Sequence, residues 1–552
     1  MLHYKMLLLG DTVIDPIVRF LADPGVEPVI QATVGPYNQI YQTLMDPSHA
    51  VWQNDSDILL IWSTPQSVIP SFEKLQRYEN VSTDEILREV ERFAELVRKA
   101  SAKHKATFVI SWSLPPHLRW NQAMTYQHNI GLTNILMQMN LLLAQYFSKH
   151  KNIVMLDSQY WYAALQKKSY DPKMYAIGKI HYTRDFFALA AEEIKAVVKG
   201  VFGQGKKLII CDLDNTLWGG IIGDDGIDHI KLGGIDPVGE SFVMFQKELK
   251  SLKNRGILLA ICSKNNQDIA MEVIEHHPGM VLRRDDFAAY QINWNDKAEN
   301  IAKIASDLNI GLQSVVFLDD NPVERDRVKH AFPEIYTPDL PEDFTHYPNF
   351  LSALRCFDTL EITQEDRVRT ELYRSEIKRK VALQEVASKE EWLKTLDIVV
   401  TVRLLEKSDL PRAVQLLNKT NQFNMATNRY TEPEYWEWSQ VSNNRVYVFY
   451  VRDKFGDVGL TGVLSVALKE ETAEIIDFVM SCRVMGKQIE DAMLWTVLSN
   501  IQAEKPATVR AIYRKTAKNS PFYEYIKSKY KDETTGVLEI AAVNKPDHIT
   551  IL

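Results

Sequence analysis

Residues 207–218 read KLIICDLDNTLW, a short apolar strand that ends in two carboxylates and a hydroxyl. Side chains alternate across a strand, so Asp212 and Asp214 leave its carboxyl end on the same side, where open α/β sheets bind ligands. Two carboxylates this close repel each other unless a cation lies between them or one of them holds a proton, and both arrangements suit phosphate chemistry. The segment therefore predicts a Mg²⁺-dependent phosphoryl site on an α/β sheet.

The composition is that of an ordinary globular protein without a strong charge bias. The chain has 552 residues, more than the ~250–300 at which single cores stop growing, so we expect several domains. Hydrophobic residues make up 45%, and the formal charge of −8 gives no electrostatic reason to expect a nucleic-acid partner. The four cysteines are scattered without CxxC spacing, which argues against a disulfide framework or a thiolate zinc site.

The first residues, MLHYKMLLLGDT, contain an apolar run that stops at Gly10 and Asp11. This run is too short for the core of a signal peptide or for a membrane span. We therefore expect a cytoplasmic protein without a membrane partner.

The order of expected strands and helices predicts a multidomain α/β fold. Residues 1–200 alternate strands with helical segments, as a doubly wound α/β domain does, and 83–100 carries apolar residues at helical spacing. A second α/β domain covers 201–345, with strands in KLIICDLD, ILLAICS and SVVFLDD. Residues 346–396 predict a helical linker with a charged, solvated face, and 397–552 a strand-rich α+β domain.

Three elements after the first acidic pair make the motif specific. The strand ending ICSKN places Ser263 at its end, Lys297 in NWNDKAENI begins a helix, and SVVFLDDNPVER ends a strand with Asp319 and Asp320. Each residue alone is explained by a turn or a cap at a strand end. Together and in this order they resemble the haloacid dehalogenase (HAD) superfamily, which implies a Rossmann-like domain with a phosphate-cleaving site.

The chemistry explains why these residue types are needed. A phosphoester is shielded by its own negative charge, so Asp212 can attack it only beside cations, which Mg²⁺ and Lys297 would supply. Asp214 is placed to protonate the leaving oxygen and then to deprotonate the attacking water. Ser263 would donate a hydrogen bond to the transferred group. The expected metal ligands are Asp212, Asp214, Asp319 and Asp320. The expected substrate-binding residues are Asn215, Thr216, Lys264 and Asn265.

Short intervals between the motifs predict an open site. Ser263 follows Asp214 by only 49 positions and Lys297 follows Ser263 by 34, which leaves little room for an inserted cap domain. A neighbouring domain or a bulky substrate is then expected to exclude water. The segment WGGIIGDDG, 218–226, is either a small flap or a simple hairpin, because its glycines permit tight turns.

A narrower resemblance rests on CDLDNTLWGGIIGDDG, FLDDNPVER and LNKTNQFNMATNRYTEPE (417–434). These segments are similar to the FkbH-like branch of the HAD superfamily, whose members load a glyceryl unit from 1,3-bisphosphoglycerate onto an acyl carrier protein and release phosphate. The resemblance implies an enzyme that cleaves phosphate and can couple this to acyl transfer. Members that load glyceryl groups often have Cys where this chain has Leu213, and we expect Cys211 and Cys262 to be buried core thiols. Hydrolysis is therefore the first hypothesis, and a non-catalytic interaction or scaffold protein is the alternative.

The C-terminal domain resembles a GNAT-type acyltransferase. The loop Arg483-Val484-Met485-Gly486-Lys487-Gln488 precedes a helix, where backbone N–H groups can bind a pyrophosphate. The resemblance implies that Arg483, Gly486 and Lys487 bind CoA or a carrier's phosphopantetheine; a purely structural domain is the alternative. The amide-rich residues Asn418, Asn421, Gln422 and Asn424 suit loop hydrogen bonds better than substrate contact.

The N-terminal domain carries Gly10-Asp11-Thr12 at a strand-to-helix turn and resembles SGNH hydrolases there. A hydroxyl nucleophile needs a histidine partner, but His181 has Gly178 where the family has Asp. Asn38 and Asn134 are candidate oxyanion donors. We expect a non-catalytic scaffold.

Overall fold

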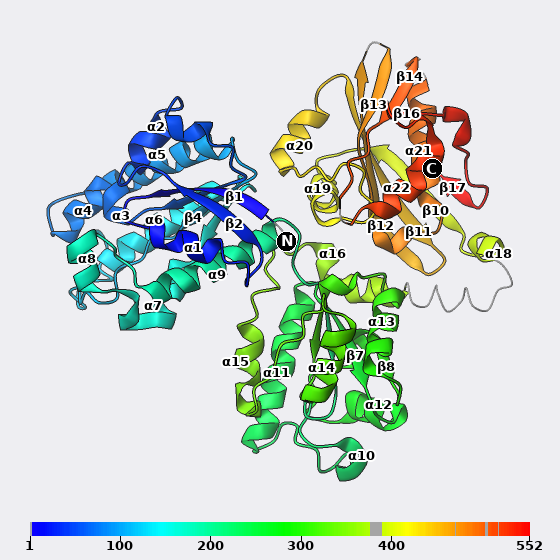
Figure 1. Cartoon of the computed structure of the whole chain (residues 1–552), viewed down its shortest axis with the longest axis horizontal. Coiled ribbons are helices and arrows are strands. Elements are labelled where there is room, and N and C mark those ends of the chain that lie inside the picture. The colour runs from blue at the N-terminus through cyan, green and yellow to red at the C-terminus, as the bar shows by residue number, and fades with distance from the viewer. Residues whose placement is uncertain (1–2, 376–388, 470, 503–505, 517) are drawn as a thin grey trace. The chain divides into compact units, whose positions relative to one another are not determined.

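The computed structural model describes residues 3–375, 389–469, 471–502, 506–516 and 518–552. They form two compact units, Met1–Val201 and Phe202–Leu552 (Figure 1). In the described residues, no helix is both long and apolar enough to cross a membrane.

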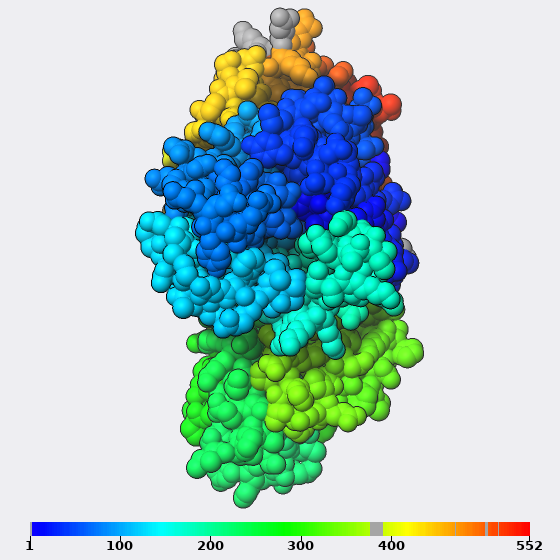
Figure 2. Space-filling view, turned by 90° about the vertical axis from the view of Figure 1, so that its left-hand side faces the viewer, coloured from blue at the N-terminus to red at the C-terminus, as the bar shows by residue number. Residues whose placement is uncertain are grey.

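The first unit is a parallel five-stranded sheet with helices on both faces (Figure 1). Its strands, in the sheet order β2-β1-β3-β4-β5, are Val29–Val34, His3–Gly10, Ile58–Trp62, Ala106–Ile110 and Ile153–Leu156. Its α-helices are α1 Val18–Leu21, α2 Ile40–Met45, α3 Pro65–Val68, α4 Pro70–Gln76, α5 Thr83–Ser101, α6 Leu132–Phe147, α7 Ser158–Leu165, α8 Pro172–Gly178 and α9 Arg184–Val201. Figure 2 shows one face of this unit, coloured from blue to turquoise, in a space-filling view.

The sequence predicted most of this sheet. Both β3 and β4 are buried along their whole length, as expected of parallel strands covered on two faces. Helix α5 is capped by Ser82, whose side chain accepts a hydrogen bond from the Glu85 N–H, and it buries the apolar residues that predicted it. Strand β2, VIQATV, lies at the sheet edge and is half exposed, so its sequence lacks the continuous apolar run of β3 and β4.

The second unit contains a four-stranded parallel sheet in the order β8-β7-β6-β9. These strands are β6 Leu208–Cys211, β7 Leu258–Ser263, β8 Phe287–Ile292 and β9 Val315–Leu318. The helices around it are α10 Ile222–Asp225, α11 Pro237–Asn254, α12 Gln267–His276, α13 Lys297–Asp307, α14 Pro322–Ala331 and α15 Tyr347–Ser352. Alternate residues of β6 enter two apolar clusters, one on each face of the sheet, so β6 is held on both sides.

The rest of this unit is built on an eight-stranded mixed sheet, in the order β15-β16-β14-β13-β12-β11-β10-β17. Its strands are β10 Ile398–Leu404, β11 Asn444–Asp453, β12 Gly456–Lys469, β13 Thr472–Met480, β14 Thr508–Ala511, β15 Tyr530–Asp532, β16 Val537–Leu538 and β17 Ile549–Ile551. The helices are α16 Gln364–Arg367, α18 Lys389–Lys394, α19 Leu410–Lys419, α20 Glu432–Ser439, α21 Ile489–Ile501 and α22 Ser520–Ile526. Strands β10–β13 form an antiparallel meander, and α21 crosses over to β14, which is parallel to β13. Residues 376–388 of the predicted helical linker lie outside the described residues.

The fully buried Gln246 in α11 joins two loops of the parallel-sheet region. Its amide nitrogen donates to the Leu217 carbonyl at 2.8 Å, and its amide oxygen accepts from the N–H groups of Val281 and Leu282 at 2.9 and 3.1 Å. Buried backbone groups such as these are costly to leave without a partner. Gln246 therefore fixes the segment that follows the first acidic pair.

We predict that Gln246→Met destabilises this region by about 3 kcal/mol, because three buried backbone groups lose their partner. Hydrogen exchange of the Val281 and Leu282 amides in the full-length protein should become much faster. The exposed neighbour supplies the control, Lys247→Met, which should leave this exchange unchanged. Unaltered protection in the Gln246 variant would show that the side chain does not hold these loops.

Candidate active site

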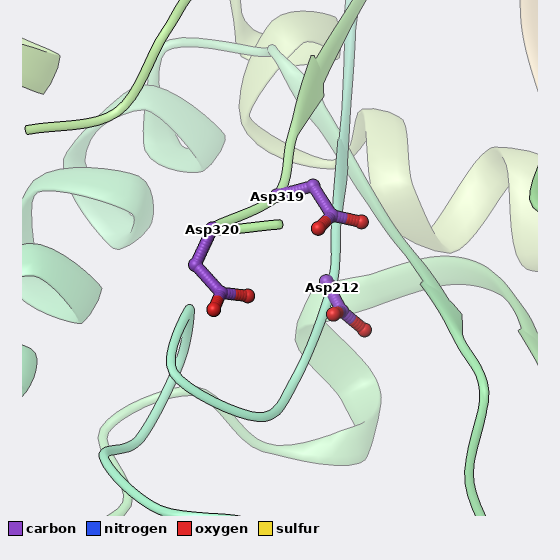
Figure 3. Close-up of side chains that lie close together, drawn as sticks. All are labelled: Asp212, Asp319 and Asp320. Atoms are coloured by element: carbon purple, nitrogen blue, oxygen red, sulfur yellow. The ribbon is translucent and has the colours of Figure 1, made fainter. Parts of the chain in front are cut away.

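Three carboxylates converge at the carboxyl edge of the parallel sheet. Asp212 follows β6, and Asp319 and Asp320 follow β9, which is the neighbouring strand. The Asp212 N–H donates to the Leu318 carbonyl at 2.9 Å, so the ladder itself brings the two strand ends together. One oxygen from each carboxylate lies within 4.8 Å of the others. Figure 3 shows the three side chains close together at the ends of their strands.

Lys297 supplies the positive charge between two of these carboxylates. It is the first residue of α13, whose start is fixed because the Asp296 side chain accepts from the Ala298 and Glu299 N–H groups. Its ammonium lies 2.9 Å from Asp212 Oδ2 and 2.6 Å from Asp319 Oδ2. Burial opposes its charge, but the two carboxylates outweigh burial and hold the pKa of Lys297 above its usual value.

The charge of the cluster fits a divalent cation. Three carboxylates face a single ammonium, and Asp212 Oδ1 is buried without a hydrogen-bond partner in the described part of the chain. Burial first, and then the charge of Asp212, raise the pKa of Asp319 and raise that of Asp320 to about 6. Hard oxygen ligands on a rigid edge are what Mg²⁺ prefers, so Asp212, Asp319 and Asp320 could hold one.

Asp214 lies beside the cluster but engages a different set of partners. Its Oδ1 accepts from Trp218 Nε1 at 2.9 Å and from the Ile222 N–H at 3.1 Å, and its Oδ2 accepts from Asn265 Nδ2 at 3.0 Å. The structure does not bring its carboxylate into the group of metal-ligating oxygens. Burial and, to a lesser extent, Asp212 raise the pKa of Asp214, as a proton donor requires.

The predicted substrate-binding residues fall into two groups. Ser263, at the end of β7, is buried, and Asn265 binds Asp214. Lys264 instead turns outward and pairs with Glu324 at the start of α14, with 2.6 Å between Nζ and Oε1.

The loop after Asp214 is organised by its own side chains. Asn215 adopts a left-handed backbone conformation with φ of 52°, and its Oδ1 accepts from the Gly220 N–H at 2.9 Å. The fully buried Thr216 accepts from the Asp320 N–H at 3.2 Å, which links the two acidic loops. Both residues therefore shape the site.

The segment 218–226 is neither a bare hairpin nor a free loop. It contains the one-turn helix α10, and its base is closed where the backbones of Gly219 and Lys231 exchange hydrogen bonds of 3.0 and 2.8 Å. Trp218, which is fully buried, anchors it beside Asp214.

Thiols are absent from the reacting surface of the described residues. Cys211 and Cys262 are both buried, as predicted, and burial raises the pKa of each. The Leu213 side chain is also fully buried, within the apolar cluster on one face of the sheet.

Sequence reasoning missed Arg325 in α14. Its guanidinium donates to the carbonyl oxygens of Asp319 and Asp320 at 2.8 and 2.7 Å, and the side chain is largely buried. It therefore fixes the backbone that carries two of the acids. The signal was its position one helical turn after Asn321, which caps α14 directly behind the acidic pair.

The predicted pyrophosphate loop of the C-terminal region is folded inward. Lys487 is buried, and its ammonium donates to the Arg483 carbonyl at 3.3 Å, whereas Gly486 is exposed with φ of 79°. The first turn of α21 carries Glu490 and Asp491, whose negative charges oppose an anion at this helix end.

The amide-rich stretch before α20 forms loop hydrogen bonds. Asn418 exchanges hydrogen bonds with the Tyr430 backbone, and Asn424 donates to the Leu417 and Thr420 carbonyls. Asn421 accepts from Arg429, and Gln422 lines a cavity described below.

The first unit does not assemble a hydrolase triad at Thr12. Asp11 accepts hydrogen bonds from the Thr64 N–H and hydroxyl at 2.5 and 2.7 Å, and burial raises its pKa to about 6. His181 packs against Tyr175 and lines a cavity of about 40 Å³ whose described lining does not include Thr12. Of the oxyanion candidates, Asn38 accepts from Ser67 and Asn134 from Gln138.

Comparisons with known proteins relate the chain to a solved phosphatase-domain structure. No family model and no curated protein matches the chain. Among solved structures, the chain is similar to the N-terminal part of the protein BF1531 from Bacteroides fragilis, which contains a phosphatase domain and was crystallised with Mg. The two are 30% identical, the match covers 65% of this chain and 95% of that one, and the TM-score is 0.59.

Two acetyltransferase structures match about a quarter of the chain. One is an acetyltransferase from Trypanosoma brucei, with 18% identity, 94% of its own length covered and a TM-score of 0.19. The other is the ribosomal-protein-S18-alanine N-acetyltransferase from Escherichia coli, with 14% identity, 88% of its own length covered and a TM-score of 0.18. Both similarities are too low to bear on the fold or activity of this chain.

The raised carboxylate pKa values predict how pH governs metal binding. Since the pKa of Asp320 rises from 3.8 to about 6 on folding, the folded metal-free chain binds more protons than the unfolded one across this window. Its free energy of unfolding should therefore fall as pH rises from about 4 to about 6. Mg²⁺ must displace these protons, so the rise in melting temperature that saturating Mg²⁺ causes should grow over the same window.

Thermal unfolding with and without Mg²⁺ at a series of pH values measures this effect. In Asp320→Asn the growth with pH should be smaller, because one titrating ligand is gone. A Mg²⁺ effect of constant size from acid to neutral pH would contradict the assignment.

Proposed function

Because the chain belongs to the same family as BF1531, a protein that contains a phosphatase domain, we propose that its second unit is a Mg²⁺-dependent phosphatase acting through Asp212. The observation that carries this proposal is the state of the Asp212 carboxylate. One oxygen lies 2.9 Å from Lys297, and the other is buried without a partner among the described residues. A carboxylate oxygen left free beside a buried cation is suited to attack an electrophile.

The first step is attack of an Asp212 oxygen on phosphorus, which forms an aspartyl-phosphate as the bond from phosphorus to the ester oxygen breaks. Asp214, whose raised pKa keeps it protonated to higher pH, gives its proton to the leaving oxygen. Lys297 lowers the repulsion between the attacking carboxylate and the phosphate. A Mg²⁺ ion held by Asp212, Asp319 and Asp320 would supply the remaining positive charge.

The second step restores the enzyme. Asp214, now ionised, takes a proton from water as the water oxygen attacks phosphorus, and the bond from phosphorus to the Asp212 oxygen breaks. Inorganic phosphate leaves, and the Asp212 carboxylate is regenerated. Trp218 and Asn265 hold Asp214 in place during both transfers.

Ser263 and the loop of Asn215 and Thr216 would surround the transferred group, with Lys264 at the outer rim. A phosphorylated metabolite or a carrier-bound phosphoester fits this chemistry. The FkbH-like and GNAT-like resemblances favour coupling to glyceryl transfer onto an acyl carrier protein, with CoA or phosphopantetheine as cofactor. That alternative is weaker because Leu213 stands where a thiol carrier would be needed and is buried.

We predict that Asp212→Asn lowers Mg²⁺-dependent hydrolysis of an aryl phosphate by about a thousandfold or more, because the amide is a poor nucleophile. The matched control is Asp326→Asn on the exposed face of α14, which should keep full activity. Equal release of phosphate by wild type and Asp212→Asn would favour the scaffold alternative.

We predict that Asp214→Asn slows turnover by at least about a hundredfold, because the variant can neither protonate the leaving group nor activate water. With an aryl phosphate, whose leaving group needs little protonation, the second step should suffer most. Mass spectrometry of the quenched variant should then reveal phosphorylated Asp212. Loss of turnover without any phosphoenzyme, even after short incubation, would argue against the two-step mechanism.

A further inference from the structure

A cavity of about 140 Å³ lies within the second unit, away from the acidic cluster. Its described lining includes six basic residues and one acidic residue, Glu365; the six are Lys207, Arg369, Arg412, Lys419, Arg483 and Lys518. Here the cations line a common cavity that is only partly open to solvent, rather than a flat surface patch. The cavity is large enough for several waters or for one phosphate group with a short substituent.

The cavity lies at the opposite edge of the parallel sheet from the candidate active site. Lys207 directly precedes β6, and its backbone bonds to Leu258 and Ser314 at the amino ends of the neighbouring strands. Asp212 follows the same strand, so the two residues are separated by about 16 Å of extended chain. A ligand in the cavity would therefore not touch the acids.

Burial weakens the charged form of these cations. It lowers the pKa of Lys207 to about 8, and the neighbouring Arg369, Lys518 and Lys419 add to the shift. Burial likewise lowers the pKa of Arg412, Arg483, Lys419 and Lys518. Burial therefore makes each positive charge costly to hold unless a negative group or water contacts it.

Protein carboxylates compensate only part of this charge. Glu365 pairs with both Arg412 and Arg483, and Asp366 pairs with Arg369 and lies 3.7 Å from the Lys419 ammonium. Lys207 donates to the Lys419 carbonyl at 3.4 Å, which is a weak contact, and Lys518 makes no ion pair in the described part of the chain.

Arg483 shows most directly that a partner is missing. Its side chain is only 5% exposed, and its Nε donates to the Ser481 hydroxyl at 3.2 Å. Its Nη1, however, is buried without any hydrogen-bond partner among the described residues. A buried guanidinium N–H is normally satisfied, so this donor points to a ligand acceptor.

We propose that this cavity is a binding site for a phosphate group, held by Arg483, Lys207 and Lys518. The site goes beyond the proposed phosphatase activity, because its residues lie at the other edge of the sheet. Phosphate oxygens accept several charge-assisted hydrogen bonds at once, which matches convergent arginine and lysine donors. The group could be a small phosphate or the pyrophosphate of a nucleotide cofactor.

The test measures binding by calorimetry to full-length protein in a buffer with EDTA. Without a metal ion the three carboxylates of the candidate active site repel anions, so binding reports on the cavity. Inorganic phosphate, pyrophosphate and CoA serve as separate probes. We expect at least one to bind with one equivalent and equally well to Asp212→Asn, which separates this proposal from the phosphatase one.

The variant Lys518→Met should weaken that binding by about tenfold or more, since a charge-assisted contact is lost. Lys515→Met is the matched control, because Lys515 is exposed in the same loop and does not line the cavity. Binding of pyrophosphate or phosphate without CoA assigns a small phosphate ligand, whereas CoA binding that Lys518→Met weakens assigns the cofactor pyrophosphate.

A second measurement does not depend on the folding of a variant. Cys482 lines the same cavity and is partly exposed. A bound anion should slow alkylation of Cys482 by iodoacetamide several-fold, as read by peptide mass spectrometry, and leave Cys356 unchanged. If no probe binds, or if binding is indifferent to Lys518→Met and leaves Cys482 equally reactive, the proposal is wrong.

Discussion

The double ion pair of Lys297 with Asp212 and Asp319 is the interaction on which the parallel-sheet region depends. Adjacent parallel strands force the residues after β6 and β9 together, because the hydrogen-bonded ladder sets their spacing. Two carboxylates at this spacing would repel each other strongly in a buried site. The ammonium from the start of α13 makes the arrangement tolerable, and so the helix, the strand register and the charge of the site are fixed together.

Lys297 does not neutralise the site completely, and this incomplete neutralisation gives the site its chemistry. A fully paired cluster would be inert, whereas one ammonium among three carboxylates leaves a need for a further cation. The residues around the cluster hold its carboxylates in position. Arg325 holds the backbone of Asp319 and Asp320, and Thr216 joins this loop to the one that carries Asp214. Preorganised groups of this kind need little rearrangement when a substrate arrives.

The sequence predicted the helices and strands whose residues keep one hydrophobic pattern along their length. It failed where contacts with distant residues decide the structure. Strands such as β6 carry continuous apolar runs, and the carboxylates at their ends could be assigned from alternation alone. Strand β8, FAAYQI, was missed because it is only partly buried and its sequence has neither the helical nor the alternating hydrophobic period. The direction of Lys264 was also beyond the sequence, because it depends on Glu324, which is 60 positions away. The Arg483 loop followed a pattern for phosphate binding, yet Lys487 turns inward to a backbone carbonyl.

The two edges of the parallel sheet pose opposite electrostatic problems, and the same reasoning applies to both. At the carboxyl edge, the carboxylates of Asp212, Asp319 and Asp320 outnumber the one ammonium that pairs with them, so a metal ion completes the site. At the amino edge, the buried Arg483 and the half-buried cations around it outnumber Glu365 and Asp366, so an anion completes the cavity. The excess negative charge at one edge cannot compensate the excess positive charge at the other, because the length of β6 separates Lys207 from Asp212. Since unpaired buried charge is costly, each edge is stable only with a ligand of the opposite sign or with water in its place. The fold therefore holds unbalanced charge at both ends of β6, and binding of an ion of opposite sign at either end would be favourable.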